Sequence, residues 1–317
     1  MTTYTITHAD DVLALVADSD RSARIALACG IEPGNRLAGY LTQRHGPLGL
    51  VRLIVGADRP DPDHPYRDER QQLVADAARR LTPDTVAVAL ARTAEQNARV
   101  LTPGDVDWPE PLADLGHAQP FALWVQGNSD ALGGSHLRRV ALVGSRVATA
   151  YGEHATTTLA DGLAQRGYTV VADGGYGIAA AAHRATLAAS GCTVAVLACG
   201  TDRPIPPGNA TLFQHITNAG GALVSELPPG TGPTRQRFTA RAWLIAALCA
   251  TTVVVEASTR STALRIAEHA LSMGRTVAGV PGPITSATST GVHRLIQDGE
   301  TRLVATVEDI TELIPTG

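Results

Sequence analysis

Lysine is absent from the chain. All 26 basic residues of the 317 are arginine, beside 30 acidic residues. P-loop nucleotidases, protein kinases and Schiff-base enzymes each need a lysine in their mechanism, so the sequence excludes these classes. The high content of Ala, Gly, Pro and Thr favours a GC-rich gene as the origin of this bias. Arginine still offers a planar fork of donors suited to phosphate.

Other features are scarce too. Aromatic residues make up 4% of the chain, and no apolar run approaches the ~20 residues of a membrane span. The start, MTTYTITHADDVLALV, has two acidic residues and no basic one, unlike a secretory leader. We therefore expect a cytoplasmic protein without membrane contact. No CxxC spacing occurs, so we expect buried reduced thiols rather than disulfides or a metal site at Cys29, Cys192, Cys199 and Cys249.

The charge is unevenly distributed. Residues 1–134 hold 12 Arg and 18 acidic residues (−6), residues 135–299 hold 13 Arg and 8 acidic residues (+5), and residues 300–317 hold one Arg and four acidic residues (−3). The net charge of −4 argues against a generally cationic nucleic-acid binder. A basic centre between acidic ends nevertheless indicates a polyanion site in the middle of the chain.

The length and a mean hydropathy of +0.03 predict a globular protein of about two domains. Short helices, such as Ala9–Ala17 and Asp68–Leu81, are predicted before residue 97, interrupted by Ile31–Asn35 and the proline-rich Asp58–Tyr66. We expect a small helical domain at residues 1–97 and an extended Rossmann-like domain at 98–317, with no C-terminal winged helix.

After a lone strand at Leu123–Gly127, short β-branched runs alternate with Ala-rich stretches, which predicts an α/β, doubly wound, mostly parallel sheet. The six strands expected are Val140–Val143, Thr169–Ala172, Thr193–Ala198, Ala222–Ser225, Thr251–Glu256 and Thr276–Val280. The helices expected between them are Tyr151–Gln165, Ile178–Ser190, Ala210–Ala219, Thr239–Leu248 and Leu264–Ser272.

Ligands of such sheets bind beyond the carboxyl ends of the strands. The first of these loops is Gly144-Ser145-Arg146, where a glycine permits close approach and the following helix start offers N–H donors to an anion. An ordinary turn with an exposed arginine explains this motif equally well. The second loop holds Gly174, Tyr176 and Gly177, with the tyrosine as a stacking surface. Neither loop reads GxGxxG.

The run Arg235-Gln236-Arg237-Phe238-Thr239-Ala240-Arg241 combines three arginines with an aromatic ring, the pairing that single-strand binders use. A solvated helix start whose phenylalanine packs inward is an equal alternative. Arg260 is placed to reach a phosphate, and Ser261 to cap the next helix.

Three further residues are of types that can act in catalysis. His183 is expected to be a structural histidine within an Ala-rich face. Glu226 and Glu256 both end strands, but no histidine or metal-ligand spacing supports a catalytic carboxylate pair. We expect no catalysis, no cofactor and no metal.

Motifs in a fixed order resemble the DprA/Smf family of DNA-processing proteins, in a diverged form of actinobacterial type. They cover roughly residues 98–305 and read VALVGSR (140–146), GGYGI (174–178), AVLACGTDRPIPPGN (195–209), SELPPG (225–230), RFTAR (237–241), VVVEA (253–257), VPGP (280–283) and HRLIQDG (293–299).

This resemblance implies a non-catalytic protein that binds single-stranded DNA, forms a homodimer through its Rossmann domain, and assists loading of a RecA-type recombinase in natural transformation and DNA recombination. It maps the family pocket onto Gly144, Ser145, Arg146, Gly174, Gly177, Arg237, Phe238 and Arg241.

The chain departs from the family pattern at four places. The usual carboxylate is replaced by Ala179, a basic residue and an amide are lost at Ala242-Trp243, a glycine becomes Thr262, and Ala172-Asp173 puts a negative charge beside the expected phosphate site. Weaker DNA affinity would follow, partly offset if Trp243 stacks on a base.

Two other classes of function stay open. The same loops would serve a nucleotide-binding sensor or scaffold, with Asp173 meeting a ribose or base. An enzyme related to nucleoside-monophosphate phosphoribohydrolases ranks last, because their PGG-glycine-threonine-glutamate loop is absent.

Overall fold

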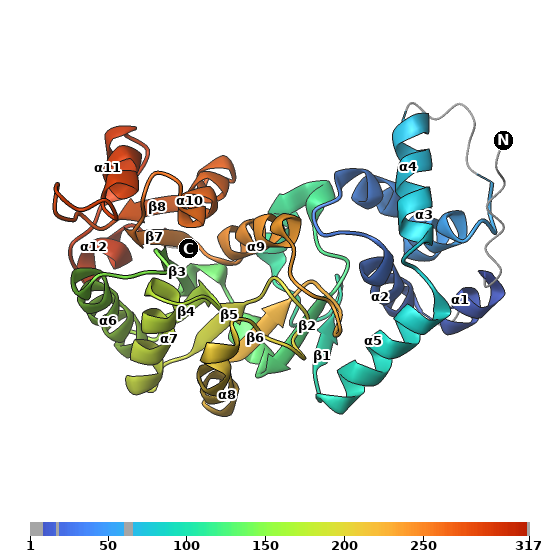
Figure 1. The fold of residues 1–317 in the computed structure, drawn as a ribbon, viewed down its shortest axis with the longest axis horizontal. Helices are drawn as coiled ribbons and strands as arrows, with labels where there is room; N and C mark the ends of the chain where they lie inside the picture. Colours follow the sequence, from blue (N-terminus) through green and yellow to red (C-terminus); the bar gives the residue numbers. More distant parts are fainter. Residues whose placement is uncertain (1–8, 17–18, 60–65, 316–317) are drawn as a thin grey trace.

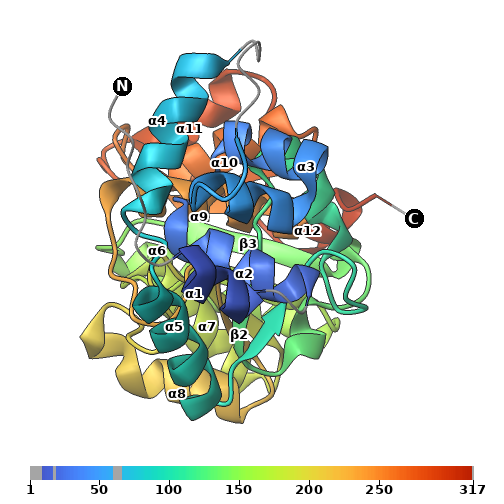
Figure 2. The same cartoon turned by 90° about the vertical axis from the view of Figure 1, so that its right-hand side faces the viewer.

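A computed structural model describes residues 9–16, 19–59 and 66–315 of the chain. Within these residues, α-helices gathered at one end of the molecule precede a nine-stranded sheet (Figure 1). The helices are α1 (Ala9–Val16), α2 (Asp20–Gly30), α3 (Arg36–Ile54), α4 (Arg67–Ala78) and α5 (Pro83–Glu95). Viewed from that end, α1, α2 and α5 lie in front of the sheet (Figure 2).

The sheet has the order β1-β2-β6-β5-β4-β3-β7-β8-β9. The seven strands from β3 to β9 run parallel to one another. Strand β2 pairs antiparallel with β6, and β1 pairs antiparallel with β2. The bounds are β1 (Arg99–Leu101), β2 (Leu123–Gly127), β3 (Arg139–Gly144), β4 (Thr169–Asp173), β5 (Thr193–Val196), β6 (Ala222–Ser225), β7 (Thr251–Glu256), β8 (Thr276–Gly279) and β9 (Arg302–Leu303).

Helices cover both faces of the sheet. On one face lie α6 (Ala150–Gln165), α7 (Ile178–Ala188), α8 (Ala210–Asn218) and α12 (Val307–Glu312), and on the other α9 (Arg235–Leu248), α10 (Thr262–Ser272), α11 (Thr290–Gln297) and the 3-10 helix η1 (Glu110–Ala118). Short 3-10 turns are η2 (Ser129–Leu132), η3 (His136–Arg138) and η4 (Pro207–Asn209). Along β3, Val140 and Leu142 pack on the α6 side, and Ala141 and Val143 on the α9 side. This double coverage explains the continuously apolar strands and confirms the predicted doubly wound sheet.

The predicted strand positions agree with the structure, and the bounds of β2, β6 and β7 match as stated. Helix α9 differs, because it begins at Arg235 rather than Thr239. The Thr234 hydroxyl accepts the backbone N–H of Arg237 and so caps the helix one turn earlier than the apolar pattern indicates. The short elements β1, β9, α11 and α12 were not predicted. The predicted helix Ala9–Ala17 is α1, although Ala17 lies outside the described residues.

The N-terminal helices pack on the antiparallel end of the sheet. Trp124 of β2 is fully buried against Ile25 and Ala28 of α2, and its indole N–H donates to the Thr93 hydroxyl at 3.0 Å. Residues 60–65, in the predicted proline-rich break, lie outside the described residues, and the division of the chain between residues 97 and 98 stays a prediction. None of the described helices has the length and apolar character needed to cross a membrane.

Candidate nucleic-acid interface

The loops singled out in the sequence meet at the carboxyl ends of the central strands. The chain adds β4, β5 and β6 on one side of β3, and then β7, β8 and β9 on the other. The loops after β3 and β7 therefore border the place where the direction of winding reverses, which is the usual ligand crevice of an open α/β sheet.

The glycines of these loops serve contacts within the protein. Gly177 has φ +67°, and a Cβ there would lie 2.3 Å from the Ser145 carbonyl oxygen. Next to it, the backbone N–H of Ile178 donates to the same carbonyl at 3.0 Å. A Cβ at Gly174 would lie 2.9 Å from the Ile205 carbonyl oxygen. The loops are thus held against each other by backbone packing, and a phosphate-binding role for these glycines stays a prediction.

Phe238 of α9 lies between an arginine of the loop after β3 and a second arginine of its own helix. The guanidinium carbon of Arg146 lies 5.4 Å from the centre of the Phe238 ring, and that of Arg241 lies 5.0 Å from it. Arg146 is exposed, Phe238 half-buried and Arg241 buried. Both distances are within cation–π range, so Phe238 is a flat platform with a buried cation and an exposed one.

Asp173 neutralises Arg241. An Arg241 Nη2–H donates to Asp173 Oδ2 at 2.6 Å, and the backbone N–H of Gly175 donates to Oδ1 at 2.6 Å. The side chains of Arg241 and Asp173 are only 7% and 17% exposed. The negative charge expected beside the phosphate site is therefore paired with Arg241, because a guanidinium this deeply buried needs a counter-charge. Its place next to a phosphate stays a prediction.

Arg237 is also engaged. It donates through Nε and Nη2 to the two carboxylate oxygens of Glu32, at 2.9 and 2.8 Å, and Glu32 lies in the loop between α2 and α3. Arg80 donates to the same carboxylate at 2.9 Å. Glu32 was not predicted as a site residue, since nothing local in the sequence relates it to a residue 205 positions away.

Four arginines of this region are exposed, and none forms an ion pair within the part of the chain that the structure describes. They are Arg146, Arg235, Arg260 and Arg265. Arg265, which the sequence analysis missed, donates to the Thr239 hydroxyl at 3.2 Å and so lies beside α9. Its position one turn into the helix after β7 was the feature of the sequence that could have identified it.

Two of the predicted site residues, Ser261 and Tyr176, contact residues near them in the fold. Ser261 caps α10 as predicted, accepting the backbone N–H of Ala263 at 3.3 Å. Tyr176 is 48% exposed, and its hydroxyl would lie 2.5 Å from a Cβ at Gly208. Its ring therefore lies along the η4 turn with one part open to solvent.

Glu256 fills the start of α6 from the end of β7. Its carboxylate, 2% exposed as a residue, accepts the backbone N–H of Thr149 at 3.0 Å and the hydroxyls of Thr149 and Thr288 at 2.6 and 3.1 Å. Helix starts attract anions, and here the protein's own carboxylate takes that place. It does not pair with Glu226, because three strands separate β6 from β7 in the sheet, a spacing of roughly 19 Å at ~4.8 Å per step.

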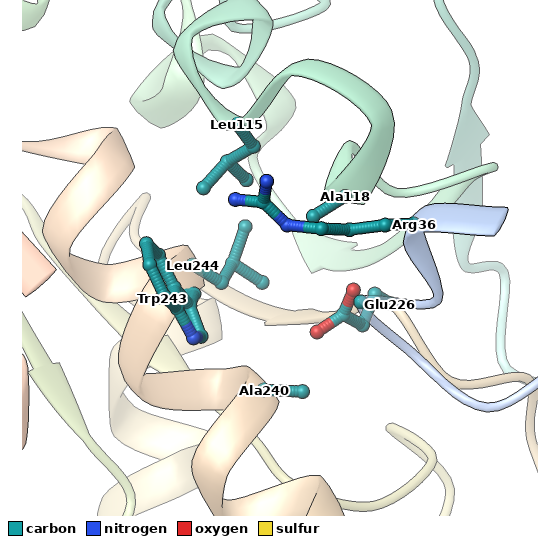
Figure 3. A pocket seen from close by; sticks show the side chains of 8 residues that line it. Arg36, Leu115, Ala118, Glu226, Ala240, Trp243 and Leu244 are labelled. Atoms are coloured by element: carbon teal, nitrogen blue, oxygen red, sulfur yellow. The ribbon is translucent and has the colours of Figure 1, made fainter. Parts of the chain in front are cut away.

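Glu226 instead lines a cavity of about 80 Å³ between α3, η1 and α9 (Figure 3). The Arg36 side chain extends across this cavity toward Leu115, and the carboxyl group of Glu226 points into it. Burial raises the pKa of Glu226 to about 8. Trp243 lines the same cavity and stacks on His269, with ring centres 3.7 Å apart. Trp243 is therefore part of the packing between α9 and α10, which argues against the base-stacking role considered for it.

His183 is fully buried, with Nδ1 2.7 Å from the Thr193 hydroxyl and Nε2 3.0 Å from the Asp173 carbonyl oxygen. Burial lowers its pKa to about 4, so the ring is neutral at pH 7. The structural role predicted for it is confirmed. The four cysteines are free thiols, with Cys199 and Cys249 buried and Cys29 and Cys192 half-buried.

The DNA recombination-mediator protein A family matches residues 99–315. A putative DNA processing protein DprA of Mycobacterium tuberculosis is 39% identical over 309 residues, covering 90% of this chain and 76% of the relative. DNA processing protein DprA of Streptococcus pneumoniae is 36% identical over 203 residues, covering 64% of this chain and 70% of the relative.

Two solved structures are similar as well. That of DprA from Streptococcus pneumoniae superposes with a TM-score of 0.75 at 26% identity, covering 94% of this chain and 99% of that one. DNA processing protein A from Helicobacter pylori, whose structure concerns its single-stranded DNA binding mode, gives a TM-score of 0.60 at 24% identity over 68% of this chain and 94% of that one. The second likeness supports the fold alone.

The pair of Asp173 and Arg241 predicts non-additive losses of stability. Asp173→Ala leaves a buried guanidinium unpaired, and we expect it to lower the free energy of unfolding by about 2–4 kcal/mol. The double variant Asp173→Ala/Arg241→Met should lose about 1–3 kcal/mol less than the two single variants combined. Urea unfolding of the wild type and the three variants measures this, and strictly additive losses would contradict the pairing.

The raised pKa of Glu226 predicts that the free energy of unfolding falls as pH rises. Its pKa is about 8 in the folded chain against 4.5 when exposed, so the folded state keeps a proton that the unfolded state releases above pH 4.5. Stability therefore declines between about pH 5 and 8 and levels off above. Glu226→Gln cannot titrate, so it should be about 1–3 kcal/mol more stable than wild type at pH 8.5, partial solvent access reducing the full value, and nearly equal at pH 5. Thermal unfolding across this range tests the prediction, with the exposed Glu268→Gln as the matched control.

Proposed function

Because the chain belongs to the DNA recombination-mediator protein A family, whose match spans most of its length, we propose that it binds single-stranded DNA and catalyses no reaction. The strand-binding face consists of Phe238 and the exposed arginines at the strand ends. Its members are Gly144, Ser145, Arg146, Gly174, Tyr176, Gly177, Arg235, Phe238, Arg260, Ser261 and Arg265, with Arg237 and Arg241 behind them.

The observation that carries this proposal is the stack of Arg146, Phe238 and Arg241. The buried Arg241 cation restrains the aromatic ring beside it, so the ring offers a preorganised surface for one base. The exposed arginines around it supply sequence-independent contacts to phosphates. Such a combination fits a flexible strand, whose bases are free to stack, rather than a duplex.

Arg241 has a supporting role in this arrangement. Its charge is compensated by Asp173 at 2.6 Å, so it positions the Phe238 ring and contributes little attraction to phosphate. Arg146 is exposed and moves aside or contacts the adjacent phosphate when a base occupies the ring. The free charge of the face therefore comes from Arg146, Arg235, Arg260 and Arg265.

Family membership also supports a homodimer, a RecA-type recombinase as protein partner, and a place in DNA uptake, transformation and recombination. The names of the relatives, DNA processing proteins from several bacteria, agree with this setting. Light scattering of the purified chain tests the dimer. RecA filament formation on strands coated with single-strand binding protein tests the partner.

A mononucleotide-binding sensor is the alternative, and two contacts argue against it. The anion position at the start of α6 is filled by the Glu256 carboxylate, and the Asp173 carboxylate is bonded to Arg241. Neither is free for a phosphate or a ribose. In thermal shift assays, millimolar mononucleotides should leave Tm nearly unchanged while oligo-dT raises it. The opposite pattern would favour the sensor.

Substitutions on the face should weaken strand binding in two distinct ways. We expect Phe238→Ala to cost about 1–3 kcal/mol of affinity through lost stacking, with little change in salt dependence. Arg146→Ala should lower affinity and reduce the slope of log K against log salt by about one. Fluorescence anisotropy with labelled oligo-dT from 50 to 200 mM salt measures both effects.

The matched control is Arg138→Ala, which removes an exposed arginine at the amino end of β3, at the opposite end of the strands from the face. It should bind like wild type. Absence of wild-type binding at tens of micromolar strand would overturn the proposal, as would affinities of Arg146→Ala and Phe238→Ala equal to that of the control.

A further inference from the structure

Glu32 lies against the proposed strand-binding face and holds one of its arginines. The two carboxylate oxygens accept from Nη2 and Nε of Arg237, and Arg80 also donates to Oε1 of this carboxylate. The side chains of Glu32 and Arg237 are 16% and 17% exposed, and that of Arg80 is 49% exposed. This contact ties the loop between α2 and α3 to the first turn of α9.

The Glu32 carboxylate stands where a phosphate would be most strongly attracted. Arg237 is the third residue of α9, whose first turn contains no acidic residue. A helix start attracts anions through its free N–H groups and dipole. Arg237 and Arg80, which both donate to Glu32, add to that attraction. The bidentate fork between Arg237 and Glu32 is also the geometry in which guanidinium binds phosphate oxygens.

We propose that Glu32 is an internal competitor for strand phosphates at Arg237. A bound strand exchanges the Glu32 carboxylate for one of its phosphates, and the loop between α2 and α3 is released from α9. This inference rests on the proposed function and adds that strand affinity is set partly by the N-terminal helices.

The surroundings of the contact permit this exchange. Glu32 keeps Arg80 as a partner after it leaves Arg237, so no unpaired charge remains. Arg237 keeps its bond to the Gly232 carbonyl oxygen, which holds the guanidinium at the helix start. A second ion pair between the N-terminal helices and the loop after β5, from Arg92 to Asp202 at 3.1 Å, involves neither residue, so the exchange does not require it to open.

The ion pair of Asp173 and Arg241 is more deeply buried than that of Glu32 and Arg237, and we do not expect it to open. Its guanidinium is 7% exposed, and its carboxylate also accepts a backbone N–H from Gly175. Both residues belong to the sheet and its covering helix. The Glu32 contact is more open, comes from a separate group of helices, and has a spare cation in Arg80. Exchange is therefore expected at Arg237 and not at Arg241.

Glu32→Gln in the full-length protein tests the exchange, because it removes the competing charge and keeps the size of the side chain. With labelled oligo-dT at 50 mM salt, we expect binding about 3–10-fold tighter than wild type and a salt slope steeper by about one. Arg80→Gln leaves Glu32 to Arg237 alone and should weaken binding by a similar factor. In an Arg237→Ala background, Glu32→Gln should have no effect.

The control variant is Asp58→Asn, which makes the same change of net charge at an ion pair with Arg52 remote from the face. It should bind within about twofold of wild type. Hydrogen exchange of residues 31–38 gives an independent readout, and we expect it to quicken when oligo-dT binds the wild type.

The outcomes separate the two proposals. Wild-type binding with Glu32→Gln equal to Asp58→Asn, or a Glu32→Gln effect that persists without Arg237, overturns the exchange and leaves strand binding intact. Absence of binding by wild type and by Glu32→Gln overturns both proposals. Tighter binding that depends on Arg237 supports the exchange.

Discussion

The constraint on which this site depends is the concentration of positive charge at the start of α9. Arg235, Arg237 and Arg241 converge there, and both their mutual repulsion and the helix dipole oppose the arrangement. Two carboxylates offset it, one from the loop after α2 and one from the end of β4. Of the three arginines, one is free, one is held by a separate group of helices, and one is fixed. The balance of these charges therefore joins the loop after α2 to α9 and holds the cation beside Phe238 in place.

Two of the departures from the family pattern have a structural explanation. The acid gained at Asp173 bonds to the arginine retained at Arg241, so the two positions act as one unit. Where the pattern has a second basic residue, Trp243 turns to the cavity beside η1 and stacks on His269. The side chain at that position therefore packs between helices and carries no positive charge. The exposed Arg265 on the neighbouring α10 places a cation near α9.

Local sequence was sufficient for the sheet and insufficient for the ion pairs. Runs such as Thr251–Glu256 predict strands because both faces of the sheet are covered, and three valines follow two threonines there before the final glutamate. The start of α9 was placed four residues late, since its first turn is polar and only the cap at Thr234 marks it. The pairs of Glu32 with Arg237 and of Asp173 with Arg241 join residues 205 and 68 positions apart. Charge pairing at such distances is decided by packing, which no local pattern contains.

A strand is proposed as the ligand in place of a nucleotide for a reason of geometry. A mononucleotide needs an unoccupied helix start for its phosphate, and Glu256 fills that of α6. What remains is the half-buried ring of Phe238 and separate exposed arginines on the loops after β3 and β7 and on α9 and α10. Each contact is weak by itself, so only a ligand with repeated charges and several bases gains enough from them together. A polymer meets that requirement where a single nucleotide does not.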